Sequence, residues 1–245
     1  MSIPRPEYPR PQFVRPDWLC LNGEWQFEID QGDSGLERGL LERELANKIT
    51  VPFCPEAPLS GVANPDFMDA VWYRRTVTVP EAWADRRVLL HFQAVDYDAT
   101  VWIDGAEVAR HRGGFTPFSC EIPDAQAGKT YTIVVRARDD HQAPKPRGKQ
   151  SREYAGHGAL YGRVTGIWQT VWLEPVLDVW LQRPRITPDL ANGMFRLVQP
   201  LAGARRPGLT LRVTLRDEQG VVVAASCAAS ADFAPQLDLP IPAER

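Results

Sequence analysis

The chain has 245 residues, of which 44% are hydrophobic and 24% are charged, an ordinary composition for a soluble globular protein. Its formal net charge of −3 argues against a nucleic-acid partner and against an anionic membrane surface. No run approaches the roughly 20 apolar residues that span a bilayer, and the N-terminal segment lacks the apolar core of a secretory signal.

The first 16 residues contain five prolines, which forbid a helix and predict an extended arm lying over its own domain. Most later segments alternate apolar and polar side chains with the period of two that is typical of half-buried strands. Residues 99–111 predict a hairpin that turns at Asp104-Gly105. The exception is 35–47, where four leucines on one face predict a short amphipathic helix. The other expected strands are 23–30, 71–80, 87–95, 130–139, 169–176 and 178–186.

Short strands separated by turn signals, without intervening helices, predict an all-β antiparallel sandwich rather than a parallel α/β fold. Past Pro184 and Pro188 the tryptophans stop, and simpler strands are expected at 194–200, 208–217 and 221–226. They resemble the opening half of an immunoglobulin-like sandwich, which needs about seven strands in roughly 100 residues. Only about 60 residues remain, so we expect the chain to stop inside this second domain.

The four cysteines, Cys20, Cys54, Cys120 and Cys227, lie far apart and form no CxxC pair or Cys/His ligand spacing. A metal site is therefore not expected, and no cofactor is indicated. Buried free thiols fit a reducing compartment, so we expect a cytoplasmic protein.

One long segment, 139–164, has no sustained period and concentrates Lys145, Arg147, Lys149 and Arg152. Structureless loops beyond about 12–15 residues are uncommon in compact domains unless they are functional or disordered. The Arg, Lys, Gln, Glu, Tyr and His side chains suit a polyhydroxylated or anionic ligand. A solvated, mobile loop is the alternative.

Motifs assign no catalytic residue. The sequence has no GxSxG and no Gly-rich phosphate loop, and His91 and His111, at strand positions, fit structural roles. Glycoside hydrolysis uses two carboxyl groups about 5 Å apart or more widely spaced, and no spacing singles out such a pair. Tryptophans beside strands invite a sugar-stacking role, although buried tryptophan is the commoner arrangement. Residue types alone indicate an all-β binding or accessory module.

Six segments nevertheless form an ordered set: LNGEWQFEID (21–30), VPFCPEAPLSG (51–61), VWYRRTVTVP (71–80), HFQAVDYDATVWIDG (91–105), HRGGFTPF (111–118) and TGIWQTVWLEPV (165–176). Together they resemble the N-terminal region of glycoside hydrolase family 2, which includes β-galactosidases, β-glucuronidases and β-mannosidases. The resemblance implies a jelly-roll sugar-binding domain over 1–180, followed by an immunoglobulin-like β-sandwich, incomplete here, over 181–245. A TIM barrel with two catalytic glutamates would follow, so no catalytic role passes to a residue of this chain.

In well-studied members of that family, an aspartate five positions before the small-Gly-Ile triplet reaches the sugar pocket. Leu160 stands there and cannot hydrogen-bond a hydroxyl, which argues against assuming β-galactosidase specificity. The remaining candidates for the edge of a substrate pocket are Arg147, Lys149, Gln150 and Glu153.

We therefore expect the non-catalytic N-terminal region of a retaining exo-β-glycosidase. Its expected partners are a carbohydrate β-glycoside and the catalytic barrel of the same polypeptide, and a homo-oligomer is compatible with this reading. The residues also leave open a free-standing lectin-like module, with the ability to bind sugars alone, and a structural assembly module with an exposed apolar patch.

Overall fold

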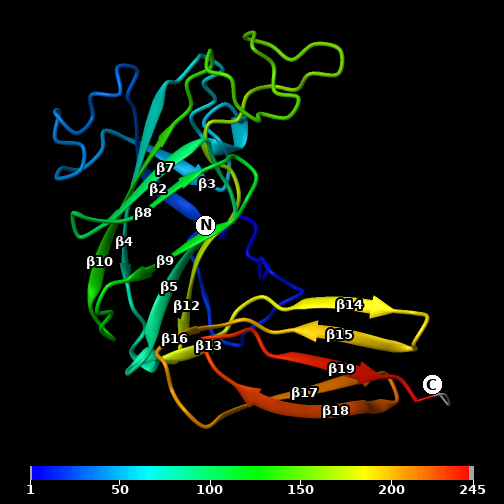
Figure 1. The fold of residues 1–245 in the computed structure, drawn as a ribbon. Coiled ribbons are helices and arrows are strands. Elements are labelled where there is room, and N and C mark those ends of the chain that lie inside the picture. Colours follow the sequence, from blue (N-terminus) through cyan, green and yellow to red (C-terminus); the bar gives the residue numbers. More distant parts are fainter. Residues whose placement is uncertain (1, 243–245) are drawn as a thin grey trace. The chain divides into compact units, whose positions relative to one another are not determined.

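The computed structural model describes residues 2–242, and nearly all of its regular structure is β-strand (Figure 1). The helical elements in this range are two single 3-10 turns, η1 (Pro58–Ser60) and η2 (Glu81–Trp83). None of the helices described is long and apolar enough to cross a bilayer. The chain divides into two compact units, Met1–Pro175 and Val176–Arg245. The all-β class is confirmed.

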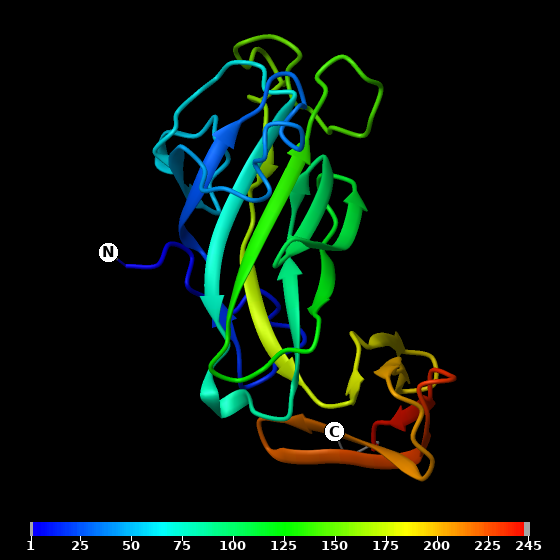
Figure 2. The same cartoon turned by 90° about the vertical axis from the view of Figure 1, so that its left-hand side faces the viewer.

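Two main sheets build the first unit. The larger is antiparallel, in the spatial order β3 (Asn47–Val51), β2 (Gly23–Ile29), β4 (Ala70–Thr78), β10 (Thr130–Arg138), β7 (Asp98–Ile103) and β8 (Ala106–Arg112). The smaller has the order β1 (Leu19–Cys20), β12 (Val171–Val176), β5 (Arg87–Phe92) and β9 (Phe118–Ile122). A short pairing joins β6 (Val95–Asp96) to β11 (Gly166–Ile167). In Figure 2 the paired strands β4 and β10 run side by side.

The core of this unit draws on alternate residues of both sheets, as a sandwich requires. Its large, fully buried members include Trp25, Phe27, Tyr73, Leu90, Phe92 and Ile122. Each such side chain contributes on the order of 1.5–3 kcal/mol when it leaves water. The strands that the alternating pattern predicted are confirmed as β2, β4, β5, β10 and β12, although β5 and β12 are buried on both faces rather than half-buried. Most tryptophans are buried, five of the eight in all: Trp25, Trp72, Trp83, Trp102 and Trp172.

The helix predicted for 35–47 is wrong. The segment forms successive turns, and Gly39 adopts a left-handed conformation (φ +70°) that interrupts any helix. Leu40 and Leu45 are still buried, but they cover the outer face of the larger sheet together with Trp72, Trp102 and Val134. Gly35 is needed there, because a Cβ at this position would lie 2.5 Å from Trp72 Nε1. The apolar pattern thus predicted correctly that these leucines are buried, but it predicted incorrectly that they lie on a helix.

The predicted hairpin is confirmed. β7 and β8 are joined by Asp104 (φ +48°) and Gly105 (φ +83°), the double positive φ of a tight two-residue turn. A β-bulge shifts the register just beyond Val101, so that Asp98 faces Arg112. Sequence analysis did not identify β3 and β9 as strands.

The second unit consists of small sheets. They pair β13 (Val179–Leu181) with β16 (Leu201–Gly203), β17 (Leu209–Asp217) with β18 (Gly220–Ala229), and β15 (Met194–Val198) with both β14 (Arg185–Asp189) and β19 (Gln236–Pro240). The strand expected at 178–186 is therefore two strands. The last part of the chain, beyond the final strand predicted at 221–226, supplies β19; residues 243–245 lie outside the described range.

The proline-rich arm lies over its own domain, as predicted. Asn22 Nδ2 donates to the carbonyls of Pro4 and Arg5, both at 3.1 Å, and Gln93 Nε2 donates to Pro9 O at 2.8 Å. These contacts replace the backbone pairing that prolines cannot make.

Two arginines of the arm reach a buried carboxylate on β12. Arg10 Nη2 lies 2.8 Å from Glu174 Oε1, Arg15 binds the same oxygen, and His91 Nε2 lies 2.9 Å from it. Burial alone would raise the pKa of Glu174, but His91, Arg15 and Arg10 lower it to about 2. Burial lowers the pKa of His91. His91 therefore has the structural role that its strand position predicted.

Candidate functional site

The long loop 139–164 is internally ordered. It leaves β10 at Asp139, whose N–H donates to Asp69 O at 2.9 Å, and it returns just before β11. Within it, Tyr161 N donates to Lys149 O at 3.0 Å and Ser151 N donates to Tyr161 O at 2.7 Å. The loop thus closes on itself through a parallel bridge between Gln150 and Tyr161, which disfavours the solvated, mobile alternative.

A buried polar cluster fixes the base of this loop. Gln150 uses both ends of its amide: Nε2 donates to Asp96 Oδ2 at 2.6 Å, and Oε1 accepts from Val164 N at 3.0 Å. Lys145 Nζ pairs with Asp139 Oδ1. A third carboxylate, Glu56, accepts from Thr165 N at 3.2 Å. Gln150 is therefore bound to a carboxylate of the sandwich, and Lys145 is bound to the carboxylate at the start of the loop, next to β10.

Asp96 is the most perturbed carboxyl group of this cluster. Burial, and then the charge of Asp139, raise its pKa to about 6, although the Gln150 amide opposes the shift. Its Oδ1 has no hydrogen-bond partner among the described residues. Gly114 leaves room for the carboxyl group, because a Cβ there would lie 2.6 Å from Asp96 Oδ1. Burial likewise raises the pKa of Glu56, and that of the neighbouring Cys54 thiol to about 12.

The four predicted site residues divide into two kinds. Gln150 is buried in the cluster above, and Arg147 donates to the carbonyls of His141 (2.9 Å) and Ala143 (2.7 Å). Lys149 and Glu153 are exposed, and Glu153 Oε2 lies 3.6 Å from His157 Nδ1. Three of them line a cavity of about 510 Å³ that Lys149 does not reach, with Lys145, Pro146, Gly148, Arg152, His157 and Leu160.

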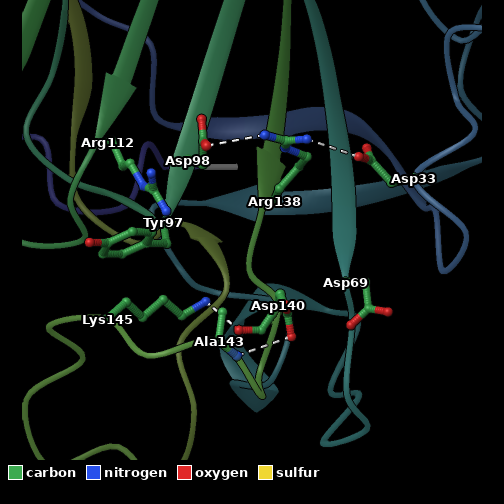
Figure 3. A pocket seen from close by; sticks show the side chains of 9 residues that line it. All are labelled: Asp33, Asp69, Tyr97, Asp98, Arg112, Arg138, Asp140, Ala143 and Lys145. Carbon is green, nitrogen blue, oxygen red and sulfur yellow. Dashed lines mark hydrogen bonds and ion pairs between the residues drawn. The ribbon is translucent and has the colours of Figure 1, made fainter.

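A second cavity, of about 350 Å³, lies where β7, β8 and β10 meet the loop (Figure 3). Its lining residues are Asp33, Asp69, Tyr97, Asp98, Arg112, Arg138, Asp140, Ala143 and Lys145. This cavity was not predicted from the sequence. The predicted hairpin was the available signal, since it brings residues near 98 and 112 together.

Most of the charges in this cavity are fixed by neighbours. Arg138 binds Asp33 and Asp98, each at 3.2 Å. Asp140 Oδ1 accepts from Gln142 N at 2.8 Å, and this contact lowers the pKa of Asp140. Arg112 differs from them: in the described part of the chain its guanidinium has no hydrogen bond or ion pair, and its Cζ lies 5.8 Å from the centroid of the Tyr97 ring.

Asp69, Asp140 and His141 are the described residues whose side chains gather as potential metal ligands, with ligand atoms within 4.8 Å of one another. Asp140 is exposed, and His141 also stacks on Phe67 with ring centroids 4.2 Å apart. Carboxylates at a surface often approach this closely without a metal, so the geometry alone does not define a metal site.

A two-sheet sandwich with polar cavities beside one long ordered loop is an architecture that carbohydrate-binding domains use, among domains of other functions. Comparison with known proteins agrees: residues 56–142 match the family described as glycosyl hydrolases family 2, sugar binding domain. The chain belongs to glycoside hydrolase family 2 and represents the N-terminal region of a member. The expected family is confirmed.

Among curated relatives, a β-glucuronidase from Paenibacillus borealis is 29% identical over 221 residues, which are 82% of this chain and 36% of that protein. A Rattus norvegicus β-glucuronidase is 30% identical over 230 residues, 83% of this chain and 36% of that protein. A Thermoanaerobacter pseudethanolicus β-galactosidase is 26% identical over 68% of this chain and 21% of that protein. The chain thus spans little more than a third of the two β-glucuronidases and about a fifth of the β-galactosidase.

Solved structures show the same fold. A β-glucuronidase from Lactobacillus rhamnosus superposes with a TM-score of 0.70 at 23% identity, over 94% of this chain and 40% of that one. A Ruminococcus gnavus β-glucuronidase gives 0.72 at 17% identity, also over 94% and 40%.

Proposed function

We propose that the whole protein is a retaining exo-β-glycosidase acting on β-glucuronides, and that loop 139–164 of this chain shapes the rim of its active site. The hydrolysis itself would be carried out by two glutamates of a catalytic barrel on the same polypeptide. This chain would contribute shape and hydrogen bonds rather than a nucleophile or an acid.

The observation that carries this proposal is the double attachment of the loop to buried carboxylates. A rim loop must hold its side chains within a fraction of an ångström, and it does so through polar groups that anchor it from below. Gln150 on Asp96 and Lys145 on Asp139 provide such anchors. The names of the relatives support the glucuronide as substrate, and Leu160 in place of the aspartate argues against a galactoside.

The first test is the length of the native product, followed by its activity on aryl β-glucuronides and aryl β-galactosides. In that protein, Gln150→Ala is expected to raise KM for the glucuronide about 5–10-fold, because a loosened loop positions substrate less well. Gln142→Ala, an exposed change in the same loop, is the matched control and is expected to leave KM unchanged. Equal effects of the two variants would contradict the proposed role of the loop.

The 245-residue chain alone is expected not to hydrolyse aryl β-glycosides. Turnover by the purified chain that disappears on mutation of one of its own carboxylates would overturn the proposal. A cytoplasmic location and assembly into a homo-oligomer belong to the same proposal; fractionation of the source cell and sedimentation of the native product test them.

A further inference from the structure

We propose that Ser119 is an activated nucleophile, a modification site that takes acyl or phosphonyl groups from reactive esters with His91 as its general base. This inference goes beyond the proposed function. The site lies on the smaller sheet, outside loop 139–164, and it involves neither a sugar nor the catalytic barrel.

Three neighbouring strands of the smaller sheet bring a hydroxyl, an imidazole and a carboxylate together (Figure 1). Ser119 on β9 is paired directly with His91 on β5, and β12, on the other side of β5, carries Glu174. Ser119 Oγ lies 2.5 Å from His91 Nδ1, and His91 Nε2 lies 2.9 Å from Glu174 Oε1. A nucleophile within hydrogen-bond reach of a base, with a third group beside that base, is the arrangement of an activated serine.

The carboxylate decides which ring nitrogen carries the proton. An ionised carboxylate has no proton to donate, so the proton of the neutral imidazole is favoured on Nε2, beside Glu174. Nδ1 then keeps its lone pair and can accept the proton of the Ser119 hydroxyl. The two nitrogens exchange places relative to the usual Ser-His-Asp arrangement, but each group has the same task.

The surroundings of His91 suit it as a base. Its side chain is buried and its ring is stacked on Trp172, with centroids 4.1 Å apart, which fixes its orientation. Burial lowers the pKa of His91, Glu174 opposes this shift, and the charges of Arg10 and Arg15 add to it. The imidazole is therefore unprotonated at neutral pH. The arm network keeps its structural role, and the nitrogen that faces the serine is the one that this network does not use.

The nucleophile itself is open to solvent. Ser119 is exposed on β9, the edge strand of the smaller sheet, whereas its base is buried. It lines neither of the two cavities described above, so the site selects reagents by their reactivity rather than by their shape. Such a site serves modification rather than turnover of a bound substrate.

The step is a transfer of an acyl or phosphonyl group. Ser119 Oγ attacks the electrophilic carbon or phosphorus and forms a new bond to it. The bond to the leaving group breaks, and that group departs with the electron pair, as p-nitrophenolate from an aryl ester or as fluoride from a fluorophosphonate. The hydroxyl proton passes to His91 Nδ1 and from there to the leaving group or to water.

Two other hydroxyl groups of the chain serve as comparisons. Ser226 is also an exposed serine on a strand, but the residue paired with it is Arg212 rather than a histidine. Thr116 Oγ1 lies 3.1 Å from His111 Nε2, but among the described residues no carboxylate lies within ion-pair distance of His111. The first hydroxyl lacks the base and the second lacks the carboxylate, so both are expected to stay unmodified.

The test is labelling of the purified 245-residue chain with a fluorophosphonate probe, followed by peptide mass spectrometry. A general base contributes about 10²–10⁴-fold, so Ser119 should be phosphonylated at least about 100-fold faster than Ser226. The chain unfolded in urea should lose this difference, because the activation depends on the fold. No label, equal labelling of the two serines, or a label confined to tyrosines or lysines would each overturn the proposal.

Variants separate the roles. Ser119→Ala should remove the label, and Ser226→Ala should leave the labelling rate unchanged. His91→Gln should slow labelling at least about 100-fold, and an unchanged rate in this variant would overturn the role of the base. Glu174→Gln, a change at a positioning residue, should slow labelling of Ser119 in the fraction that circular dichroism shows to be folded, while Ser226 stays at its background rate. If neither of these two variants folds, the comparison of the two serines in the folded and unfolded wild-type chain decides.

Discussion

Glu174 and Asp96 are both buried carboxyl groups of the same sandwich, and their surroundings have opposite effects on them. Glu174 meets two arginines of the N-terminal arm and His91, and its pKa is lowered to about 2. Asp96 meets the neutral amide of Gln150 and lies near the charge of Asp139, and its pKa is raised to about 6. The negative charge of Glu174 stabilises the fold, whereas the negative charge of Asp96 destabilises it.

The difference separates a structural network from a candidate site. Groups kept in an unfavourable electrostatic state are found more often where function requires them than where stability does. Asp96 lies directly under the ordered loop, while Glu174 lies under an arm that lines neither of the two cavities beside that loop. Removing the charge of Glu174 should therefore lower the free energy of unfolding, whereas removing the charge of Asp96 should raise it.

The largest effect is expected from Glu174→Gln. Loss of the carboxylate leaves Arg10 and Arg15 without their counter-charge in a mostly buried place, and breaking such a pair destabilises by about 3–5 kcal/mol. Chemical denaturation at pH 7 measures the change. Glu24→Gln, which removes an exposed partner of Lys48, is the control and is expected to cost no more than about 1 kcal/mol. A loss for Glu174→Gln as small as that of the control would show that the arm network contributes little.

Asp96→Asn is expected to stabilise the protein at pH 8 by about 2–3 kcal/mol, since it removes a charge whose pKa is raised from 3.8 to about 6. The folded state binds a proton between pH 6 and about 4 that the unfolded chain does not, so acidification through this window stabilises the native protein. The gain of the variant should therefore be full above pH 6 and vanish near pH 4. Thermal unfolding across this range measures it, and a variant less stable at pH 8 would contradict the argument.

Glu174 should make the stability of the wild-type protein depend on pH in the opposite direction. Its lowered pKa contributes stability that is present above the ordinary carboxyl value of 4.5 and is lost as the pH falls toward 2. Glu174→Gln should remove this pH dependence of the free energy of unfolding in the acid range. The pH dependence between 6 and about 4, which is due to Asp96, should remain.

A smaller effect is expected from Gln150→Ala, about 1–2 kcal/mol, because it leaves Val164 N and the Asp96 carboxyl group without a partner. The pKa of Asp96 should rise further, since the Gln150 amide opposes the shift. Carboxyl ¹³C NMR of Asp96 follows this titration. A lowered pKa in the variant would contradict the role of the amide.

The sandwich was largely predictable because alternating side chains report burial on one face of a strand. The failure at 35–47 has a local cause: Leu40 and Leu45 are buried as the apolar pattern requires, but the left-handed Gly39 prevents the helix that would connect them. Periodicity shows which side chains are buried, but it does not always show which backbone conformation carries them.

The candidate site was harder to predict, because it depends on register and on contacts distant in sequence. The β-bulge past Val101 places Arg112, rather than His111, opposite Asp98. No pattern in the sequence of the hairpin predicts this bulge. Gln150 was singled out by its loop and its residue type. Its partner Asp96, 54 positions earlier, could be found only in the fold.

The proline-rich arm has a practical consequence for anyone who expresses part of this protein. The region that matches the family begins at residue 56, and a shortened chain drawn from that match would lose β1, β2 and β3 as well as the arm. Even a start placed at β1 would remove Arg10 and Arg15 and leave the carboxylate of Glu174 uncovered. The irregular residues 2–16 are thus part of the smallest piece that can be expected to fold.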